Sequence, residues 1–287
     1  MKVLVTGVRG QLGHDVVNEL NKRGHEAVGV DIEEMDITDA ESVKRTFAEV
    51  NPQVVVHCAA WTAVDAAEDP ENVPKVYAIN AGGTKNIADE CKKSGSKMIY
   101  ISTDYVFDGR GTEPWKADCK DYGPLSVYGK SKLEGELAVS GTLEKYFIVR
   151  IAWAFGLNGK NFIKTMLNVG KTHDSVRVVC DQIGTPTYTY DLARLLVDMA
   201  ESDKYGYYHA TNEGGYISWY EFTKEIFRQA GYAAEVVPVT TAEYGISKAA
   251  RPFNSRLDKS KLTENGFRPL PDWKDALKRY LKTIIYD

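Results

Sequence analysis

A glycine-rich turn after the first apolar segment constrains the fold of this chain more than any other feature. Residues 2–6 have the β-branched character of a buried strand, and residues 11–23 have the spacing of an amphipathic helix. Between them, Gly7 permits a tight turn, Gly10 lets the main chain approach a pyrophosphate, and Gly13 permits close packing of helix on strand. Because a helix N-terminus also offers free N–H donors to phosphates, this segment predicts a dinucleotide site.

The alternation of strands and helices continues through the first half of the chain. Short β-branched segments, expected as buried parallel strands, lie at residues 2–6, 27–30, 54–58, 97–102 and 147–151. Segments with helical spacing lie at residues 11–23, 39–50, 73–94 and 127–139. This order predicts an α/β fold with a Rossmann-type doubly wound parallel sheet, and we assign residues 1–152 to a dinucleotide-binding domain.

The pattern loosens after residue 152. A strand is expected at residues 176–179, and helices are expected near residues 161–169, 190–201, 219–230 and 273–284. We assign residues 153–287 mainly to a smaller C-terminal α/β lobe that binds the substrate. Whether some of its segments return to the sheet stays open at this point.

Composition excludes several classes of protein. The net charge of −4 and the pI near 5.8 disfavour a partner that is a nucleic acid or an anionic membrane. No apolar run approaches the roughly eighteen residues of a membrane span, and the first strand begins too early for a signal peptide, so we expect a cytoplasmic protein. The four cysteines lack Cys-x-x-Cys spacing and the five histidines lack i, i+4 spacing, so we expect no metal centre.

Two residues give conflicting indications about the cofactor. Asp31 follows the second expected strand, where a carboxylate can accept hydrogen bonds from the adenosine ribose and favour NADH. Arg9 lies in the glycine turn, where a guanidinium could attract the 2′-phosphate of NADPH, or could be an ordinary solvated cation. The sequence therefore predicts NADPH or NADH without choosing between them.

A candidate catalytic centre follows from Tyr128, Lys132 and Thr103. The first two are four residues apart near the start of an expected helix, and Thr103 ends the fourth expected strand at the edge where such sheets bind ligands. Reduction of a ketone by hydride needs an acid to protonate the developing alkoxide. An ammonium about 4 Å from a phenol would lower its pKa from about 10 to about 7. Spacing alone also fits a surface pair, but the glycine turn favours catalysis.

Together with these motifs, four further segments carry a resemblance to a known family. They are residues 58–65 (CAAWTAVD), 102–109 (STDYVFDG), 181–187 (DQIGTPT) and 251–257 (RPFNSRL). Over essentially its whole length the chain resembles the bacterial dTDP-4-dehydrorhamnose reductases, which are extended short-chain dehydrogenases/reductases. The resemblance implies NADPH- or NADH-dependent reduction of the C4 ketone of dTDP-4-dehydro-L-rhamnose to dTDP-L-rhamnose, the last step in making this nucleotide sugar for cell-surface polysaccharides.

The resemblance also implies roles for individual residues. Tyr128 would be the proton donor, Lys132 would activate it and bind the cofactor ribose, and Thr103 would tune its acidity and touch the substrate. The cofactor would be lined, besides Tyr128 and Lys132, by Gly7, Gly10, Gln11, Leu12, Gly13, Asp31, Asp36, Ile37, Ala59, Ala60, Trp61 and Thr62. The nucleotide sugar would be held by Thr103, Asp104, Tyr105, Trp153, Arg251 and Ser255. Trp61 stands where this family usually has Tyr or His, which puts its own contact in doubt.

One substitution separates the chain from related enzymes with other reactions. Nucleotide-sugar dehydratases typically carry Thr-Asp-Glu where this chain has Thr-Asp-Tyr, and Tyr105 therefore favours plain reduction over elimination of water. Two alternatives stay open: a reductase of another nucleotide-linked 4-keto sugar, and a non-catalytic regulatory subunit similar to that of methionine adenosyltransferase.

Some members of the family form dimers around Mg²⁺ held by glutamates. At the matching early position of the first helix this chain has Asp15, and the later matching positions are poor. A carboxylate there also stabilises the positive end of a helix. Mg²⁺ is therefore implied by the resemblance but not supported by this sequence, and we expect a monomer or a weak homodimer.

Overall fold

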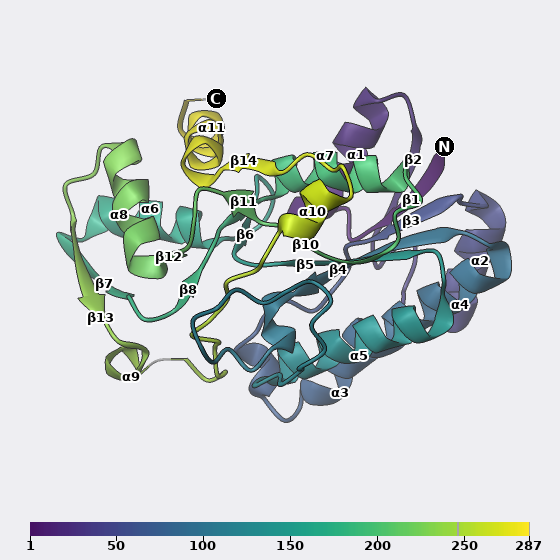
Figure 1. Ribbon diagram of the computed structural model, residues 1–287, viewed down its shortest axis with the longest axis horizontal. Coiled ribbons are helices and arrows are strands. Elements are labelled where there is room, and N and C mark those ends of the chain that lie inside the picture. Colours follow the sequence, from purple (N-terminus) through teal and green to yellow (C-terminus); the bar gives the residue numbers. More distant parts are fainter. Residues whose placement is uncertain (246, 287) are drawn as a thin grey trace.

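Six parallel strands form the central sheet of the computed structural model, which describes residues 1–245 and 247–286 (Figure 1). Their order across the sheet is β10-β5-β4-β3-β1-β2. The strands are β1 (Lys2–Thr6), β2 (Glu26–Val30), β3 (Val54–His57), β4 (Lys97–Thr103), β5 (Tyr146–Ile151) and β10 (Gly206–His209). Because neighbouring strands run parallel throughout, all their carboxyl ends lie at one edge.

Helices cover both faces of this sheet (Figure 1). On one face α1 (Gln11–Lys22) packs against α7 (Thr189–Ala200), and on the other lie α2 (Ala40–Val50), α4 (Thr84–Ser94) and α5 (Val127–Thr142). Adjacent residues of a strand point to opposite faces, so Val3 of β1 joins the core under α1 while Leu4 joins the core under α2. A short helix α3 (Val73–Tyr77) and a π-helical segment (Ala78–Gly83) lead directly into α4.

A second, smaller region contains short paired strands and an aromatic core. Its helices are α6 (Phe162–Thr172), α8 (Trp219–Ala230) and α11 (Trp273–Tyr286), which enclose buried residues such as Phe155, Phe222 and Tyr280. The strand pairs are β7 (Ser175–Val179) with β13 (Glu235–Val239), β8 (Ile183–Gly184) with β12 (Ile217–Ser218), β6 (Ala154–Phe155) with β9 (Thr187–Tyr188), and β11 (Asn212–Glu213) with β14 (Leu270–Asp272). The remaining short helices are α9 (Thr241–Tyr244) and α10 (Ser260–Glu264).

The predicted fold class is confirmed, and the chain does return to the sheet after residue 152. Helix α7 packs on α1, and β10 pairs with β5 as the sixth strand. The strand at 206–209 was not among the predicted strands. The helix predicted at 73–94 is interrupted by the π-helical turn. Among the residues that the structure describes, no helix is long and apolar enough to cross a membrane.

Candidate active site

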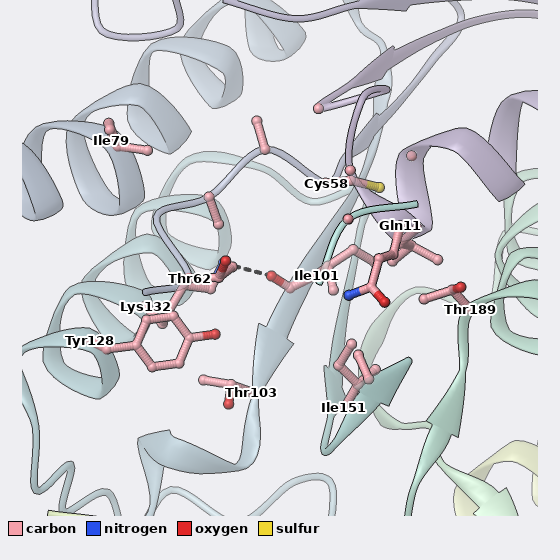
Figure 2. Close-up of a pocket in the computed structure, with 18 of the residues that line it drawn as sticks. Gln11, Cys58, Thr62, Ile79, Ile101, Thr103, Tyr128, Lys132, Ile151 and Thr189 are labelled. Carbon is pink, nitrogen blue, oxygen red and sulfur yellow. Dashed lines mark hydrogen bonds between the residues drawn. The ribbon is translucent and has the colours of Figure 1, made fainter. Parts of the chain in front are cut away.

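A deep cavity of about 1200 Å³ lies at the carboxyl edge of the sheet. It begins at the glycine turn, passes the ends of β2, β3 and β4, and reaches Trp153 and Arg251 of the smaller region. Figure 2 shows side chains from α1, β4, α5 and the start of α7 facing this space, including Gln11, Ile101, Tyr128, Lys132 and Thr189. The cavity therefore lies where the sheet half and the smaller region meet.

The glycine turn leaves its main chain open to the cavity. Gly7 has a φ of 70°, and a Cβ on it would lie 2.8 Å from the main chain of Ala59. A Cβ on Gly13 would lie 2.4 Å from the carbonyl oxygen of Gly7, so helix α1 packs directly on the turn. Gly10, the N-cap of α1, supplies no side-chain cap. The first N–H groups of α1 are thus available to a phosphate, and the cradle fits the pyrophosphate of a dinucleotide.

Gln11 joins this turn to the smaller region. Its side-chain carbonyl accepts hydrogen bonds from the main-chain N–H of Gly156 (2.7 Å) and from the Asn161 amide (3.0 Å). Asn161 also donates to Tyr280 of α11. These contacts fix the first turn of α1 against the opposite side of the cavity. Spacing along the chain gave no indication of them, since the partners are distant in sequence.

Asp31 lies at the end of β2, as predicted. Its carboxylate accepts hydrogen bonds from the main-chain N–H groups of Arg9 (3.1 Å) and Ile32 (2.9 Å). The Arg9 guanidinium does not turn toward Asp31 but forms ion pairs with Glu33 and Glu34. The carboxylate of Asp31 therefore borders the cavity beside a cation that other carboxylates already neutralise.

Most of the predicted cofactor residues line the cavity, but Trp61 does not. The lining includes Gly7, Gly10, Gln11, Leu12, Gly13, Asp31, Asp36, Ile37, Ala59, Ala60, Thr62, Tyr128 and Lys132. The indole N–H of Trp61 donates instead to the carbonyl of Ala63, and its ring lies under the ammonium of Lys75. The prediction that Trp61 contacts the cofactor gains no support from this geometry.

Helix α5 places Tyr128 and Lys132 on one side of the cavity. It begins at Val127, where the Ser126 hydroxyl accepts a hydrogen bond from the N–H of Gly129 (3.1 Å). A Cβ on Gly129 would lie 2.4 Å from the carbonyl oxygen of Tyr105, so only glycine lets the helix start this close to the end of β4. Tyr128 and Lys132 then face the cavity one helical turn apart.

The ammonium group of Lys132 is buried and held by β4. It donates a 2.7 Å hydrogen bond to the carbonyl of Ile101, drawn dashed in Figure 2, and lies 4.1 Å from the ring centroid of Tyr100. Burial lowers the pKa of Lys132 to about 7, although the charge of Glu136 opposes that shift. The side chain is therefore fixed in place by the sheet and the helix together.

The acidity of Tyr128 differs from the expectation. Burial raises its pKa, the charge of Asp104 raises it further, and the hydroxyl of Thr103 acts in the opposite direction. The predicted fall to about 7 is not found, because burial and the charge of Asp104 outweigh the opposing effect of the Thr103 hydroxyl. At neutral pH the phenol is thus protonated, which is the state that a proton donor requires.

Asp104 connects the end of β4 to the segment after residue 251. Its buried carboxylate accepts hydrogen bonds from the hydroxyls of Thr103 (3.0 Å) and Ser255 (2.5 Å). Burial raises the pKa of Asp104 to about 6, while these two hydrogen bonds lower it. Ser255 is buried behind the lining and does not border the cavity. The prediction that Ser255 contacts the substrate gains no support from this geometry, in which its hydroxyl donates to Asp104.

The remaining predicted substrate residues line the far end of the cavity. The ring of Tyr105 packs edge-on against Tyr128 at 5.5 Å between centroids, and Trp153 stacks on Trp219 at 3.7 Å. Trp219 also lines the cavity, although no role in the site was predicted for it. Arg251 lines the cavity while it forms a two-pronged ion pair with Asp65 (3.1 and 2.7 Å). Asp65 lies in the 58–65 segment quoted above, but no role was predicted for it.

The magnesium site of some relatives of this family does not fit the residues of this chain. Asp15 is only 5% exposed, and its carboxylate accepts a 2.6 Å hydrogen bond from Thr189. Burial raises the pKa of Asp15, which disfavours the ionised form that a cation needs. Within residues 1–245 and 247–286, no group of three or more His, Cys, Asp or Glu side chains could hold a metal ion.

Comparisons with known proteins agree with this architecture. A family model described as RmlD substrate binding domain matches residues 1–285. The spore coat polysaccharide biosynthesis protein SpsK of Bacillus subtilis (strain 168) is 41% identical over 281 residues, which cover 98% of this chain and 97% of that protein.

Two solved structures are also similar. A dTDP-4-dehydrorhamnose reductase from Clostridium acetobutylicum ATCC 824 has a TM-score of 0.94 and 44% identity, with 99% of each chain covered. A dTDP-4-dehydrorhamnose reductase from Bacillus anthracis str. Ames, solved in complex with NADP, has a TM-score of 0.93 and 40% identity, with 99% of this chain and 100% of that chain covered. These matches confirm the resemblance found in the sequence, and the chain belongs to the RmlD family.

Proposed function

We propose that this protein is an NAD(P)H-dependent reductase that converts the C4 ketone of dTDP-4-dehydro-L-rhamnose to the alcohol of dTDP-L-rhamnose. The observation that carries the proposal is one continuous cavity with a glycine cradle at one end, Arg251 at the other, and Tyr128, Lys132 and Thr103 between them. A dinucleotide fits the cradle, and a nucleotide sugar needs a cation near its diphosphate. Family membership supports the same reaction class.

The residues of the chain suit the proton side of this reaction. A reduced nicotinamide, when bound, would supply hydride to C4 of the sugar. The neutral phenol of Tyr128 would donate its proton to the O4 atom as negative charge develops there, and the hydroxyl of Thr103 would orient that phenol. The buried ammonium of Lys132 would stabilise the phenolate left after donation, because opposite charges attract strongly where water is excluded.

Tyr105 favours reduction over dehydration. Elimination of water from a keto sugar needs a base that removes the C5 proton, and dehydratases carry a glutamate where this chain has Tyr105. Burial and the charge of Asp104 raise the pKa of Tyr105, so its phenol is neutral at physiological pH and a poor base. Asp104 does not replace that base, because its carboxylate is occupied by Thr103 and Ser255.

The test is a turnover assay with purified protein, dTDP-4-dehydro-L-rhamnose and either NADPH or NADH. We expect oxidation of the nicotinamide, followed by its absorbance, and dTDP-L-rhamnose as the product identified by NMR. The proposal fails if no oxidation occurs under conditions in which a known dTDP-4-dehydrorhamnose reductase turns over. A panel of other nucleotide-linked 4-keto sugars distinguishes a reductase with a different substrate, since only the preferred sugar should give a high kcat/KM.

A further inference from the structure

NADH and NADPH differ by one group, the 2′-phosphate on the adenosine ribose. In doubly wound folds a carboxylate after the second strand binds the free 2′-hydroxyl, whereas an arginine nearby accommodates the phosphate. This chain has both residue types, since Asp31 follows β2 and Arg9 lies in the glycine turn. The groups around Asp31 and Arg9 determine whether the site favours the 2′-hydroxyl of NADH or the 2′-phosphate of NADPH.

The wall beyond β2 is strongly acidic. Residues 30–38 contain Asp31, Glu33, Glu34 and Asp36 and no lysine or arginine. Both Asp31 and Asp36 line the cavity. Arg9 contacts this segment directly, because its main-chain N–H donates to Asp31 and its guanidinium pairs with Glu33 and Glu34.

The carboxylate of Glu34 is anchored by main-chain geometry. It accepts a 2.9 Å hydrogen bond from the N–H of Asp31, and the N–H groups of Glu34 and Met35 in turn donate to the carbonyl of Asp31. The other oxygen of Glu34 lies 3.3 Å from the Arg9 guanidinium. Even if the exposed Arg9 side chain moves, this negative charge stays beside Asp31.

We propose that Glu33 and Glu34 neutralise Arg9 and make NADH the preferred cofactor of this chain. The proposal rests on the nicotinamide-dependent activity proposed above. With Arg9 paired, the three carboxylates of Asp31, Glu33 and Glu34 leave two net negative charges where a 2′-phosphate would have to lie. Because these groups are exposed and screened by water, the result is a preference and not an exclusion, so that a relative solved with NADP is compatible with it.

Equilibrium binding of the two cofactors, measured by quenching of tryptophan fluorescence without any sugar substrate, tests the proposal. We expect the Kd for NADPH to exceed that for NADH by about tenfold, as one like-charge repulsion between exposed groups would give. Raising the salt concentration from about 0.05 to about 0.5 M should reduce this ratio, because salt screens a repulsion. A ratio that rises with salt would show attraction instead and would overturn the proposal.

Variants distinguish the effect of the two glutamates on cofactor binding from the effect of Arg9. The double variant Glu33→Gln, Glu34→Gln keeps an acceptor for the Asp31 N–H but removes both charges, so NADPH should bind at least about threefold more tightly while NADH changes little. Glu90→Gln, on the far end of α4, removes an ion-paired carboxylate of the same kind and should leave the ratio unchanged. Arg9→Gln leaves three net negative charges in place of two, so NADPH binding should weaken by no more than about threefold while NADH binding changes little.

A selective loss of NADPH binding of about tenfold or more in Arg9→Gln would show that Arg9 binds the phosphate directly, and it would overturn the proposal. Unchanged NADPH binding in the double glutamine variant would do the same. The function proposed above fails separately: a chain that prefers NADH but reduces no nucleotide sugar leaves this inference standing. A chain that reduces the sugar but prefers NADPH retains the function and loses the inference.

Discussion

The two sides of the cavity are built in different ways. The catalytic wall (Thr103, Tyr128 and Lys132) comes from the end of β4 and the first turns of α5, where main-chain hydrogen bonds set each position. The facing wall (Trp153, Trp219 and Arg251) comes from loops and helix starts that are distant in sequence. Its side chains are held by one another or by distant partners, as in the pair of Arg251 with Asp65, 186 residues away.

This difference indicates that the catalytic wall carries out the chemical step and that the facing wall recognises the substrate. The chemical step needs a donor held at a fixed place, and regular secondary structure provides that. Recognition of a large substrate tolerates more movement, and side-chain pairs can yield to a ligand. We therefore expect changes in the catalytic wall to lower kcat and changes in the facing wall to raise KM for the nucleotide sugar.

The largest effect is expected for Tyr128→Phe. Removal of the phenolic oxygen deletes the proposed acid, so kcat should fall by roughly two to four orders of magnitude while the Kd of the nicotinamide cofactor stays the same. Single-turnover kinetics and fluorescence titration measure the two quantities. The matched control is Tyr105→Phe, which alters the ring packed edge-on against Tyr128. It should lower kcat far less than Tyr128→Phe does. Equal losses in both variants would argue against Tyr128 as the donor.

Asp104 lies at the junction of the two walls, where burial raises its pKa, so its titration should make the stability of the protein depend on pH. Because its pKa in the fold is about 6, above its ordinary value of 3.8, the folded protein binds a proton that the unfolded chain has released between those pH values. Its contribution therefore lowers the free energy of unfolding as pH rises from about 4 to about 6. Asp104→Asn lacks this dependence. As pH rises from about 4 to about 6, the free energy of unfolding of the variant should therefore increase relative to that of the parent by on the order of 2 kcal/mol.

Urea unfolding at a series of pH values measures this difference. The altered hydrogen bonds to Thr103 and Ser255 should shift the free energy of unfolding of the variant by the same amount at every pH. Only the part of the difference that changes with pH reports on the titration of Asp104. Parallel stability curves for Asp104→Asn and the parent would mean that this carboxyl titrates near its ordinary pKa.

Asp65→Asn tests the facing wall directly. The variant loses the charge that anchors the Arg251 guanidinium and weakens the hydrogen bond from the Ala249 N–H. Loss of a hydrogen bond to a charged group costs about 1.5 kcal/mol, so KM for the nucleotide sugar should rise roughly tenfold with little change in kcat. Asp69→Asn removes the neighbouring pair between the partly buried Asp69 and the exposed Lys248, and it should change KM by less than about twofold. A fall in kcat of similar size would place Asp65 with the catalytic wall.

The same contrast explains how far the sequence predicted the molecule. Local patterns predicted the five strands of the first half, the glycine turn and the pair Tyr128 and Lys132. In the structure, the turn and this pair lie at the edge formed by the carboxyl ends of the strands. The sixth strand, Gly206–His209, contains no valine, isoleucine or threonine, so it lacks the β-branched pattern that marked the other five strands. Asp65 and Trp219 act through partners that only the tertiary fold brings near.

The pKa of Tyr128 shows another limit of sequence. A spacing of four residues places two side chains on one helix face, but it does not say which acceptor the lysine will choose. Here Lys132 reaches the carbonyl of Ile101 on β4. The charge that does influence Tyr128 comes from Asp104, whose effect on the phenol is opposite to that expected from Lys132.

The smallest effect is expected for the stacked indoles of the facing wall. Trp153 has a φ of 51°, a left-handed conformation that costs a residue other than glycine about 1 kcal/mol. Its stack on Trp219, with ring centroids 3.7 Å apart, offsets about as much. Trp219→Leu should therefore raise KM for the nucleotide sugar about threefold, leave kcat unchanged, and abolish the exciton signal of paired indoles in circular dichroism. If that signal disappears while KM is unchanged, the stack supports the fold alone, and the facing wall recognises its ligand through Arg251.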